Sequence, residues 1–377
     1  MKKIYWFIQQ AEEFGGTEMV SLQILSSLAS DYDITLVLTS KKPNSYIYPV
    51  PENVKQVYLG YKMDEIRMDY YMKKYKDQKR IFKMISLALR ATFNLLIRRF
   101  FTRRKVKKMT TKDDILVATS LDNYLVMPRK RKVFYHYHFN AKFFFSLPES
   151  FFRWFMRKPD KWIFLCKSTL SDILRKKKKY KEYATYALNP VRFTPYLDEN
   201  YYNNEFIFVG RFMNQKNPLL LLKSMKELKD MGDKFVLHMY GDGPFKSEME
   251  EYISSNDLGE YILLHDSTKD ILREYKNKDM MLVSSIYEGF SLVMLEANSQ
   301  SLPIISTNWG DAVYEMVENG KNGYVVDSFE PLDFAKQVHE VIKNKEHILD
   351  MKRCSFEMSK KYTLDNTAKY WKENILK

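Results

Sequence analysis

Cysteine is scarce in this chain of 377 residues, which contains only Cys166 and Cys354. So few cysteines exclude a disulfide framework and offer no Cys/His spacing of a metal site, which fits a reducing compartment. No apolar run approaches the roughly twenty residues that a transmembrane helix needs. The basic opening of the chain is followed only by the apolar run Ile4–Ile8, which is too short for a signal peptide. We therefore expect a cytoplasmic protein.

Acidic residues are missing between Asp77 and Asp113, whereas basic residues are frequent there. The apolar residues of this stretch recur at steps of three and four, as they do on one face of a helix. A helix with one cationic and one apolar face fits peripheral binding to anionic lipid. Alternatively, the apolar stripe packs on the N-terminal sheet while its basic side chains face water. We do not expect nucleic acid as a partner, because no recognised nucleic-acid module is present. The basic residues for which we predict the membrane contact are Arg98, Arg99, Arg103, Arg104 and Lys105.

Length and charge both indicate two domains. A chain of 377 residues with 45% hydrophobic and 15% aromatic residues can bury two substantial cores. Residues 1–200 hold 39 Lys and Arg against 19 Asp and Glu, whereas the rest hold 22 against 28. The net charge therefore changes from positive to negative near Pro190 and Pro195, and these prolines interrupt helical patterns. Strand and helix patterns alternate before this point and again after it, so we expect two doubly wound parallel-sheet α/β domains, 1–193 and 194–360, with a cleft between them.

A strand, a loop and a helix are predicted between Met280 and Pro303. The buried-strand run Met280–Ser284 leads through Gly289 into an amphipathic stretch that stops before the proline. Ligands of open α/β sheets bind at the carboxyl ends of strands, so this loop offers a carboxylate, backbone amides and a helix start to an anionic, hydroxyl-rich ligand. The candidate ligand-binding residues are Glu288, Gly289, Phe290, Ser291, Leu292 and Glu296.

A second strand, loop and helix follow at Phe206–Leu222, with the helix opened by Asn217-Pro218. Arg211 and Lys216 flank this loop just before the helix. An Arg fork and a Lys charge at a helix N-terminus make a plausible clamp for a diphosphate, although solvated surface is the commoner role of such residues.

Glycines and histidines at other strand ends are further candidates. Gly16 opens a predicted helix after the strand Ile4–Ile8, and Gly241 follows the strand Phe235–Tyr240. A glycine lets the backbone approach a ligand closely. His136 and His138 end another apolar strand, and either could be a core residue instead. We favour His138 as the ligand contact because it comes last and should emerge at the carboxyl end.

The string Glu288–Ala297 resembles the Glu-x7-Glu motif of the retaining family-4 glycosyltransferases, which have the GT-B fold. The run Val209–Leu222 resembles the same family's Val-Gly-Arg-x4-Lys-x4-Leu-Leu pattern. This resemblance implies two Rossmann-like domains facing across a cleft, with the C-terminal helix 361–377 crossing back to the N-terminal domain. It also implies a bacterial surface-polysaccharide enzyme, with the acceptor and the membrane on the N-terminal domain and the nucleotide sugar on the C-terminal one.

The resemblance assigns roles to the candidates. Arg211 and Lys216 would contact the pyrophosphate of the donor, Glu288 the hydroxyls of its sugar, and Glu296 the ribose. His138 would approach the donor sugar, so that Glu288, Arg211, Lys216 and His138 form the catalytic set. The remaining donor contacts would be Gly16, Gly241, Gly289, Phe290, Ser291 and Leu292.

The expected reaction moves a sugar from a nucleotide donor, UDP-linked, to a hydroxyl of a lipid-linked or cell-envelope glycan, with retention and with no metal or cofactor. The protein would act at the inner face of the cell membrane. Two other functions stay open from the sequence. One is a sugar-nucleotide epimerase or hydrolase of the same shape, and the other is a non-catalytic membrane-docking subunit of a glycosyltransferase complex.

Overall fold

The chain forms two compact units in a computed structural model. The residues that the structure describes are 2–9, 16–40, 43, 46, 48–60, 99–146, 158–198 and 202–377. The first unit comprises residues 1–138, 145–164 and 179–185, and the second comprises 139–144, 165–178 and 186–377. The domain boundary that we expect near residue 193 and the crossing of the final helix stay predictions.

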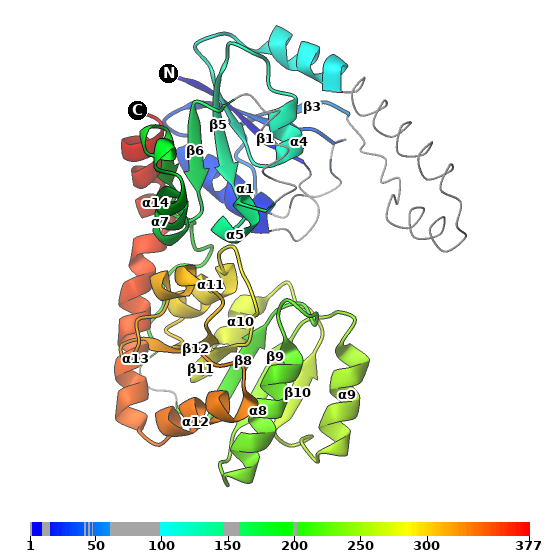
Figure 1. Cartoon of the computed structure of the whole chain (residues 1–377), viewed down its shortest axis with the longest axis vertical. Helices are drawn as coiled ribbons and strands as arrows, with labels where there is room; N and C mark the ends of the chain where they lie inside the picture. The colour runs from blue at the N-terminus through cyan, green and yellow to red at the C-terminus, as the bar shows by residue number, and fades with distance from the viewer. Residues whose placement is uncertain are drawn as a thin grey trace, which may run out of the picture. The chain divides into compact units, whose positions relative to one another are not determined.

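The first unit contains a seven-stranded sheet in the order β3-β2-β1-β4-β5-β6-β7 (Figure 1). Pairing from β3 through to β6 is parallel. The strands are β1 Lys3–Ile8, β2 Asp33–Leu38, β3 Lys55–Tyr58, β4 Ile115–Ala118, β5 Lys132–Tyr137, β6 Lys161–Phe164 and β7 Ala184–Tyr186. The neighbouring helices are α1 Gly16–Leu28, α4 Leu121–Leu125, α5 Ala141–Phe144, α7 Lys167–Lys176 and η1 Lys178–Glu182, of which α5 and α7 belong to the second unit.

The second unit contains a six-stranded parallel sheet in the order β10-β9-β8-β11-β12-β13. Its strands are β8 Glu205–Val209, β9 Val236–Tyr240, β10 Ile262–His265, β11 Met280–Val283, β12 Ile304–Thr307 and β13 Gly323–Val326. Its helices are α8 Pro218–Asp230, α9 Lys246–Ser255, α10 Ile271–Tyr275, α11 Leu292–Ser299, α12 Pro331–Ile342, α13 Lys345–Ser359 and α14 Leu364–Tyr370. Shorter helical turns are η2 Asp311–Glu315, η3 Lys360–Tyr362 and η4 Trp371–Ile375.

Helices cover both faces of the second sheet, which explains why the runs Phe206–Val209 of β8 and Met280–Val283 of β11 are continuously apolar rather than alternating. Phe206 and Phe208 of β8 point into one core, with α8, α9, α12 and α13. Ile207 between them points into the other core, which α10 and α11 cover. The prediction of two doubly wound parallel-sheet domains is confirmed.

In each sheet the strand order reverses at one place, between β1 and β4 in the first unit and between β8 and β11 in the second. Loops that leave the carboxyl ends of such neighbouring strands turn to opposite faces of the sheet, and the crevice between them is where open α/β sheets bind ligands. The two loops with the strongest sequence motifs follow β8 and β11, so the fold places both at this crevice.

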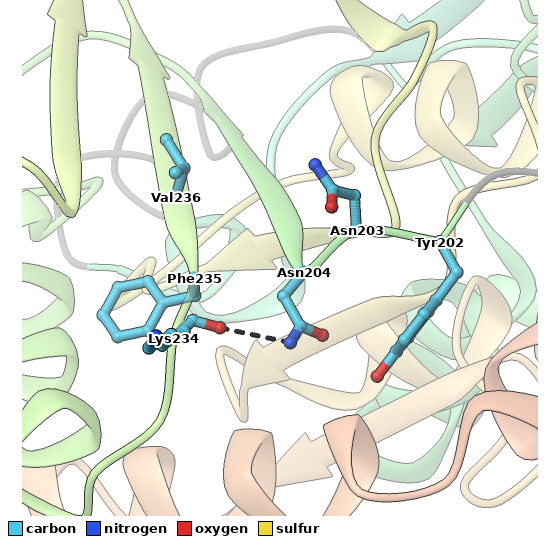
Figure 2. Close-up of a pocket in the computed structure, with 6 residues that line it drawn as sticks. All are labelled: Tyr202, Asn203, Asn204, Lys234, Phe235 and Val236. Carbon is cyan, nitrogen blue, oxygen red and sulfur yellow. Dashed lines mark hydrogen bonds between the residues drawn. The ribbon is translucent and has the colours of Figure 1, made fainter.

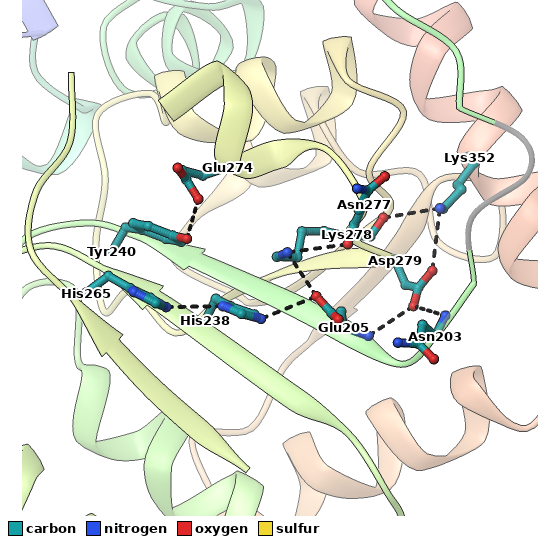
Figure 3. Close-up of polar contacts among 10 residues, drawn as sticks. All are labelled: Asn203, Glu205, His238, Tyr240, His265, Glu274, Asn277, Lys278, Asp279 and Lys352. Carbon is teal, nitrogen blue, oxygen red and sulfur yellow. Dashed lines mark hydrogen bonds and ion pairs between the residues drawn. The ribbon is translucent and has the colours of Figure 1, made fainter. Parts of the chain in front are cut away.

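A buried ion pair fastens α13 to the second sheet (Figure 3). Lys352 Nζ lies 3.5 Å from Asp279 Oδ1 and donates to the Lys278 carbonyl at 3.1 Å. The other Asp279 oxygen accepts from the backbone N–H groups of Asn203 and Glu205 at 2.8 and 3.0 Å. Burial lowers the pKa of Lys352 and raises that of Asp279. Both shifts oppose charge, so the pair depends on these mutual contacts.

A polar chain crosses the same sheet from Glu205 to His265 (Figure 3). His238 Nε2 lies 3.3 Å from Glu205 Oε2, and its Nδ1 lies 3.1 Å from His265 Nε2. The Tyr240 ring stacks on His265 with centroids 4.4 Å apart, and its hydroxyl donates to Glu274. Burial is the largest cause that lowers the pKa of both histidines.

Candidate active site

The loops after β8 and β11 meet through an ion pair between the two motifs. Lys216 Nζ lies 2.5 Å from Glu288 Oε1, and the two side chains are 17% and 8% exposed. They are 72 residues apart in the chain. A short ion pair at the reversal of strand order therefore joins two of the predicted catalytic residues.

Further hydrogen bonds fix the Glu288 carboxylate. Ser285 Oγ donates to Oε1 at 2.8 Å and Gln215 Nε2 donates to Oε2 at 3.3 Å. The loops themselves are joined, because Ile286 N donates to the Gln215 carbonyl at 2.9 Å and Ser284 Oγ donates to that of Lys216, also at 2.9 Å. The carboxylate is held from several directions, so its position is well defined before any ligand binds.

The Lys216 loop ends in a residue that turns the chain into α8. Asn217 adopts a left-handed conformation with φ of 48°, which asparagine tolerates better than most residues, and Pro218 opens the helix. Arg211 lies at the start of the loop with an exposed side chain. Among the residues that the structure describes, its guanidinium makes no hydrogen bond or ion pair, so this group is available to a ligand.

The start of α11 carries an unpaired hydroxyl. Ser291 precedes the helix and is 2% exposed, yet its Oγ has no hydrogen-bond partner in the described structure. The N–H groups of the first turn, which begins at Leu292, have no acceptors within the helix. Gly289 and Phe290 lead into this turn, with the Phe290 ring 6.3 Å from that of Tyr362. This helix start offers donors to an anion.

Glu296 lies on α11 but has partners of its own. Arg192 Nε approaches Oε1 at 2.8 Å as an ion pair, without the alignment of a hydrogen bond, and the Tyr275 hydroxyl donates to Oε2 at 3.1 Å. Burial raises the pKa of Glu296, and Arg192 and Tyr275 act in the opposite direction. In the described residues no hydrogen bond or ion pair joins this group to Lys216 and Glu288.

Arg192 and Tyr275 were missed by the sequence reasoning. Arg192 lies between Pro190 and Pro195, in the segment where the charge balance changes sign. Tyr275 lies at the end of a short helix with no motif of its own. Neither spacing nor composition links them to Glu296, so only the packing of the second unit could reveal them.

Gly241 lies where two backbone segments touch. A Cβ atom there would lie 2.0 Å from the Gly210 carbonyl oxygen, and Gly210 N donates to the Tyr240 carbonyl at 3.0 Å. The glycine is therefore required for packing between the loops after β8 and β9, whether or not a ligand also approaches it.

The candidates of the first unit lie at the ends of β1 and β5. Gly16 is the first residue of α1 and is exposed. His136 is fully buried within β5, whereas His138 follows the strand and is half-buried. Burial lowers the pKa of His138 to about 3, so its imidazole is neutral near pH 7. Their donor contacts stay predictions.

The basic stretch is described only from residue 99 onward, and Arg98 lies outside the described residues. Residues 99–109 are helical. Arg99 pairs with Asp122 at 3.1 Å, and Arg103 donates to the Leu125 carbonyl at 2.7 Å. The guanidinium carbon of Arg104 lies 4.3 Å from the centre of the Phe100 ring.

The described helix 99–109 has one packed side and one exposed side. Val106 is fully buried, so one side packs on the first unit. Phe100 and Phe101 are 52% and 57% exposed, and Lys105 is exposed as well. Packing and an exposed basic, aromatic face thus coexist on one helix. None of the helices in the described parts of the chain is long and apolar enough to cross a membrane.

A pocket of about 370 Å³ lies at the amino-terminal ends of strands in the second sheet, opposite the ends that carry the Lys216 and Glu288 loops (Figure 2). Its lining residues precede or begin β8 and β9, at their amino-terminal ends. The Asn204 side chain there donates to the Lys234 carbonyl at 3.1 Å. None of the predicted site residues lines it. The six lining residues are Tyr202, Asn203, Asn204, Lys234, Phe235 and Val236.

Solved structures define the class of this fold. A TarM variant of S. aureus, crystallised with Fondaparinux, α-GlcNAc-glycerol and UDP, matches 98% of this chain and 99% of its own with a TM-score of 0.75 at 14% identity. The fold is GT-B, as predicted.

Sequence comparison adds a match within the second unit. Residues 197–357 match the family model described as Glycosyl transferases group 1. An uncharacterized glycosyltransferase of Haemophilus influenzae is 23% identical over 99% of both chains. The amylovoran biosynthesis glycosyltransferase AmsD of Erwinia amylovora is 28% identical over 170 residues, which span 45% of this chain and 47% of AmsD. The chain thus covers about half of that relative.

Proposed function

We propose that this protein is a retaining glycosyltransferase that moves a sugar from a UDP-linked donor to a hydroxyl of a lipid-linked or cell-envelope glycan. The observation that carries the proposal is the 2.5 Å pair between Lys216 and Glu288 at the reversal of strand order, within the residues that match the Glycosyl transferases group 1 model. The UDP in the TarM structure and the name of AmsD support the donor nucleotide and the class of product.

The chemistry needs positive charge where the diphosphate leaves. Lys216 and the exposed Arg211 would supply it, together with the N–H groups at the start of α11 and the Ser291 hydroxyl. Fixed donors of this kind stabilise charge that develops in the transition state, because they need no rearrangement during the reaction. Glu288 would hold hydroxyls of the donor sugar, and Gly241 would lie beside the nucleotide.

We propose further that no metal ion takes part, since this cationic set can neutralise the diphosphate. The test is activity after exhaustive dialysis against a chelator, compared with activity after Mg²⁺ is restored. Equal rates support the proposal, and a rate that returns only with Mg²⁺ refutes it.

The main experiment measures glycosyl transfer and donor hydrolysis with purified protein, UDP-sugars and a membrane extract as the source of acceptor. Transfer that requires both donor and extract supports a transferase. Turnover of the donor with no extract favours a hydrolase or epimerase, and no turnover at all favours a docking subunit. Product stereochemistry, read from the anomeric coupling constant, tests retention.

We also propose that the exposed face of residues 99–109 binds anionic membrane at the inner face of the cell membrane. Phe100 and Phe101 would insert at the interface while Arg103, Arg104 and Lys105 approach lipid phosphates. Each basic side chain near such a surface contributes about 1 kcal/mol.

Liposome sedimentation tests the membrane proposal. Binding to vesicles with phosphatidylglycerol should weaken as salt rises and should be lost in the variant Arg103→Glu/Arg104→Glu. The double change Lys343→Glu/Lys321→Glu, at exposed positions of the second unit, is the control. Binding that ignores both salt and charge reversal would leave packing as the only role of this helix.

A further inference from the structure

The Glu296 carboxylate is held from two sides within the second unit. Arg192 Nε lies 2.8 Å from Oε1, and the Tyr275 hydroxyl donates to Oε2 at 3.1 Å. Each oxygen of an ionised carboxylate can accept about two hydrogen bonds. Both oxygens therefore keep capacity for a further donor.

One phenyl ring organises the two partners. The guanidinium carbon of Arg192 lies 4.4 Å from the centre of the Phe193 ring, and the Tyr275 ring meets the same ring edge-on with centroids 6.3 Å apart. Tyr275 is 1% exposed. The four side chains come from the segment before β8 and from α10 and α11, so their packing leaves the carboxylate little freedom to rotate.

Arg192 also provides the charge that this carboxylate needs. The Glu296 side chain is only 11% exposed, and an ionised carboxylate in such a place is costly without a cation beside it. An ionised carboxylate only accepts hydrogen bonds, whereas a ribose presents hydroxyl donors. A carboxylate that is paired with a cation and held in one orientation is suited to recognise a ribose.

We infer that Arg192 and Tyr275 are positioning residues that hold Glu296 for the ribose hydroxyls of the donor nucleotide and so set its preference for ribonucleotides. This inference rests on the proposed function, because it takes the donor nucleotide to bind beside α11. Arg192 and Tyr275 act through Glu296 and need not touch the donor.

The experiment compares the affinity for a ribonucleoside diphosphate with that for its 2′-deoxy and 3′-deoxy forms, by calorimetry. The probe is whichever of UDP, GDP and ADP gives the largest thermal shift with the unmodified chain. The variants are Glu296→Gln, Arg192→Gln, Arg192→Lys and Tyr275→Phe. Arg353→Gln, which removes an exposed arginine paired with Asp350 at 2.7 Å, is the matched control.

The unmodified chain and the control should bind the ribose form about tenfold or more tightly than the deoxy forms, because a hydrogen bond to a charged acceptor is lost in the latter. Glu296→Gln should reduce this ratio most. Arg192→Gln and Tyr275→Phe should also reduce this ratio, and Arg192→Lys should give a ratio between those of Arg192→Gln and the unmodified chain. Arg192→Gln and Tyr275→Phe should raise the donor KM more than they lower kcat.

Two failures are distinguishable. If Glu296→Gln removes the preference while Arg192→Gln and Tyr275→Phe keep it, the inference is wrong and these residues only stabilise the fold. If the unmodified chain binds none of the three nucleotides, the proposed function fails and the inference fails with it.

Discussion

Replacing Glu288 with glutamine should have opposite effects on binding and turnover. In the structure the Glu288 carboxylate forms an ion pair with the ammonium group of Lys216. We propose that this same ammonium group binds the donor diphosphate. A diphosphate must therefore share or displace this carboxylate. Glu288→Gln removes the competing charge while keeping the shape and one acceptor oxygen. We expect UDP to bind more tightly and transfer to slow.

The magnitude follows from the 2.5 Å distance between Lys216 Nζ and Glu288 Oε1. A phosphate oxygen that contacts Nζ at about 2.8 Å lies at most about 5.3 Å from Oε1. Two like charges at that distance repel by about 3 kcal/mol at an effective dielectric constant of about 20. Allowing about half for solvent and relaxation leaves about 1.4 kcal/mol, which is tenfold in affinity.

Calorimetry with UDP measures the affinity, and an initial-rate assay with donor and acceptor measures transfer. Because Glu288 is also expected to hold the donor sugar, kcat should fall by about 100-fold or more. Glu340→Gln is the control, since Glu340 is exposed on α12 and pairs with the exposed Lys343 at 3.1 Å. Weaker or unchanged UDP binding by a folded Glu288→Gln variant would refute the reasoning, as would near-normal transfer.

Three further predictions concern stability and packing in the second unit. Lys352→Met leaves the buried Asp279 without its cation, so chemical denaturation should show a loss of about 3–5 kcal/mol in the free energy of unfolding. Burial lowers the pKa of His238 and His265 below 6.5, so below about pH 6.5 the unfolded state takes up protons that the folded state does not. Stability should therefore fall as pH drops below that value, and His238→Gln should flatten the dependence. Gly241→Ala would press a methyl group against a carbonyl oxygen 2.0 Å away and should lower the melting temperature and weaken UDP binding.

The Lys352 and Gly241 variants each have a matched comparison. Lys343→Met removes an exposed lysine and should change stability little. Gly259→Ala adds a methyl group with nothing within 4 Å and should be tolerated. Full stability of the Lys352 or Gly241 variant, or a pH dependence that His238→Gln leaves unchanged, would contradict the packing described.

The motif loops illustrate how much local pattern could predict. Apolar runs at Phe206–Val209 and Met280–Val283 are continuous because these strands are buried on both faces, and each is followed by a polar loop and a helix. That periodicity predicted strand, loop and helix in the right order, and with it the doubly wound fold. Loop residues such as Arg211 and Lys216 could be named because ligands of such sheets bind beyond the carboxyl ends of strands.

Contacts between distant segments were beyond the reach of that reasoning. Glu288 and Glu296 lie on one loop and the helix that follows it, yet Glu288 pairs with Lys216 whereas Glu296 pairs with Arg192. Spacing along α11 predicts the direction of a side chain, but it does not predict which residue of another segment will contact that side chain. The Arg192 segment is 104 residues from Glu296 and carries no periodic signal.

Residue order alone was enough to set the class of each element and the chemistry at the ends of its strands, because hydrophobic periodicity and helix starts are local properties. The pairing of charged side chains from different loops depended on the order of strands in the sheet, since β8 and β11 become neighbours only when the sheet forms. Lys216 and Glu288, 72 residues apart, meet for that reason.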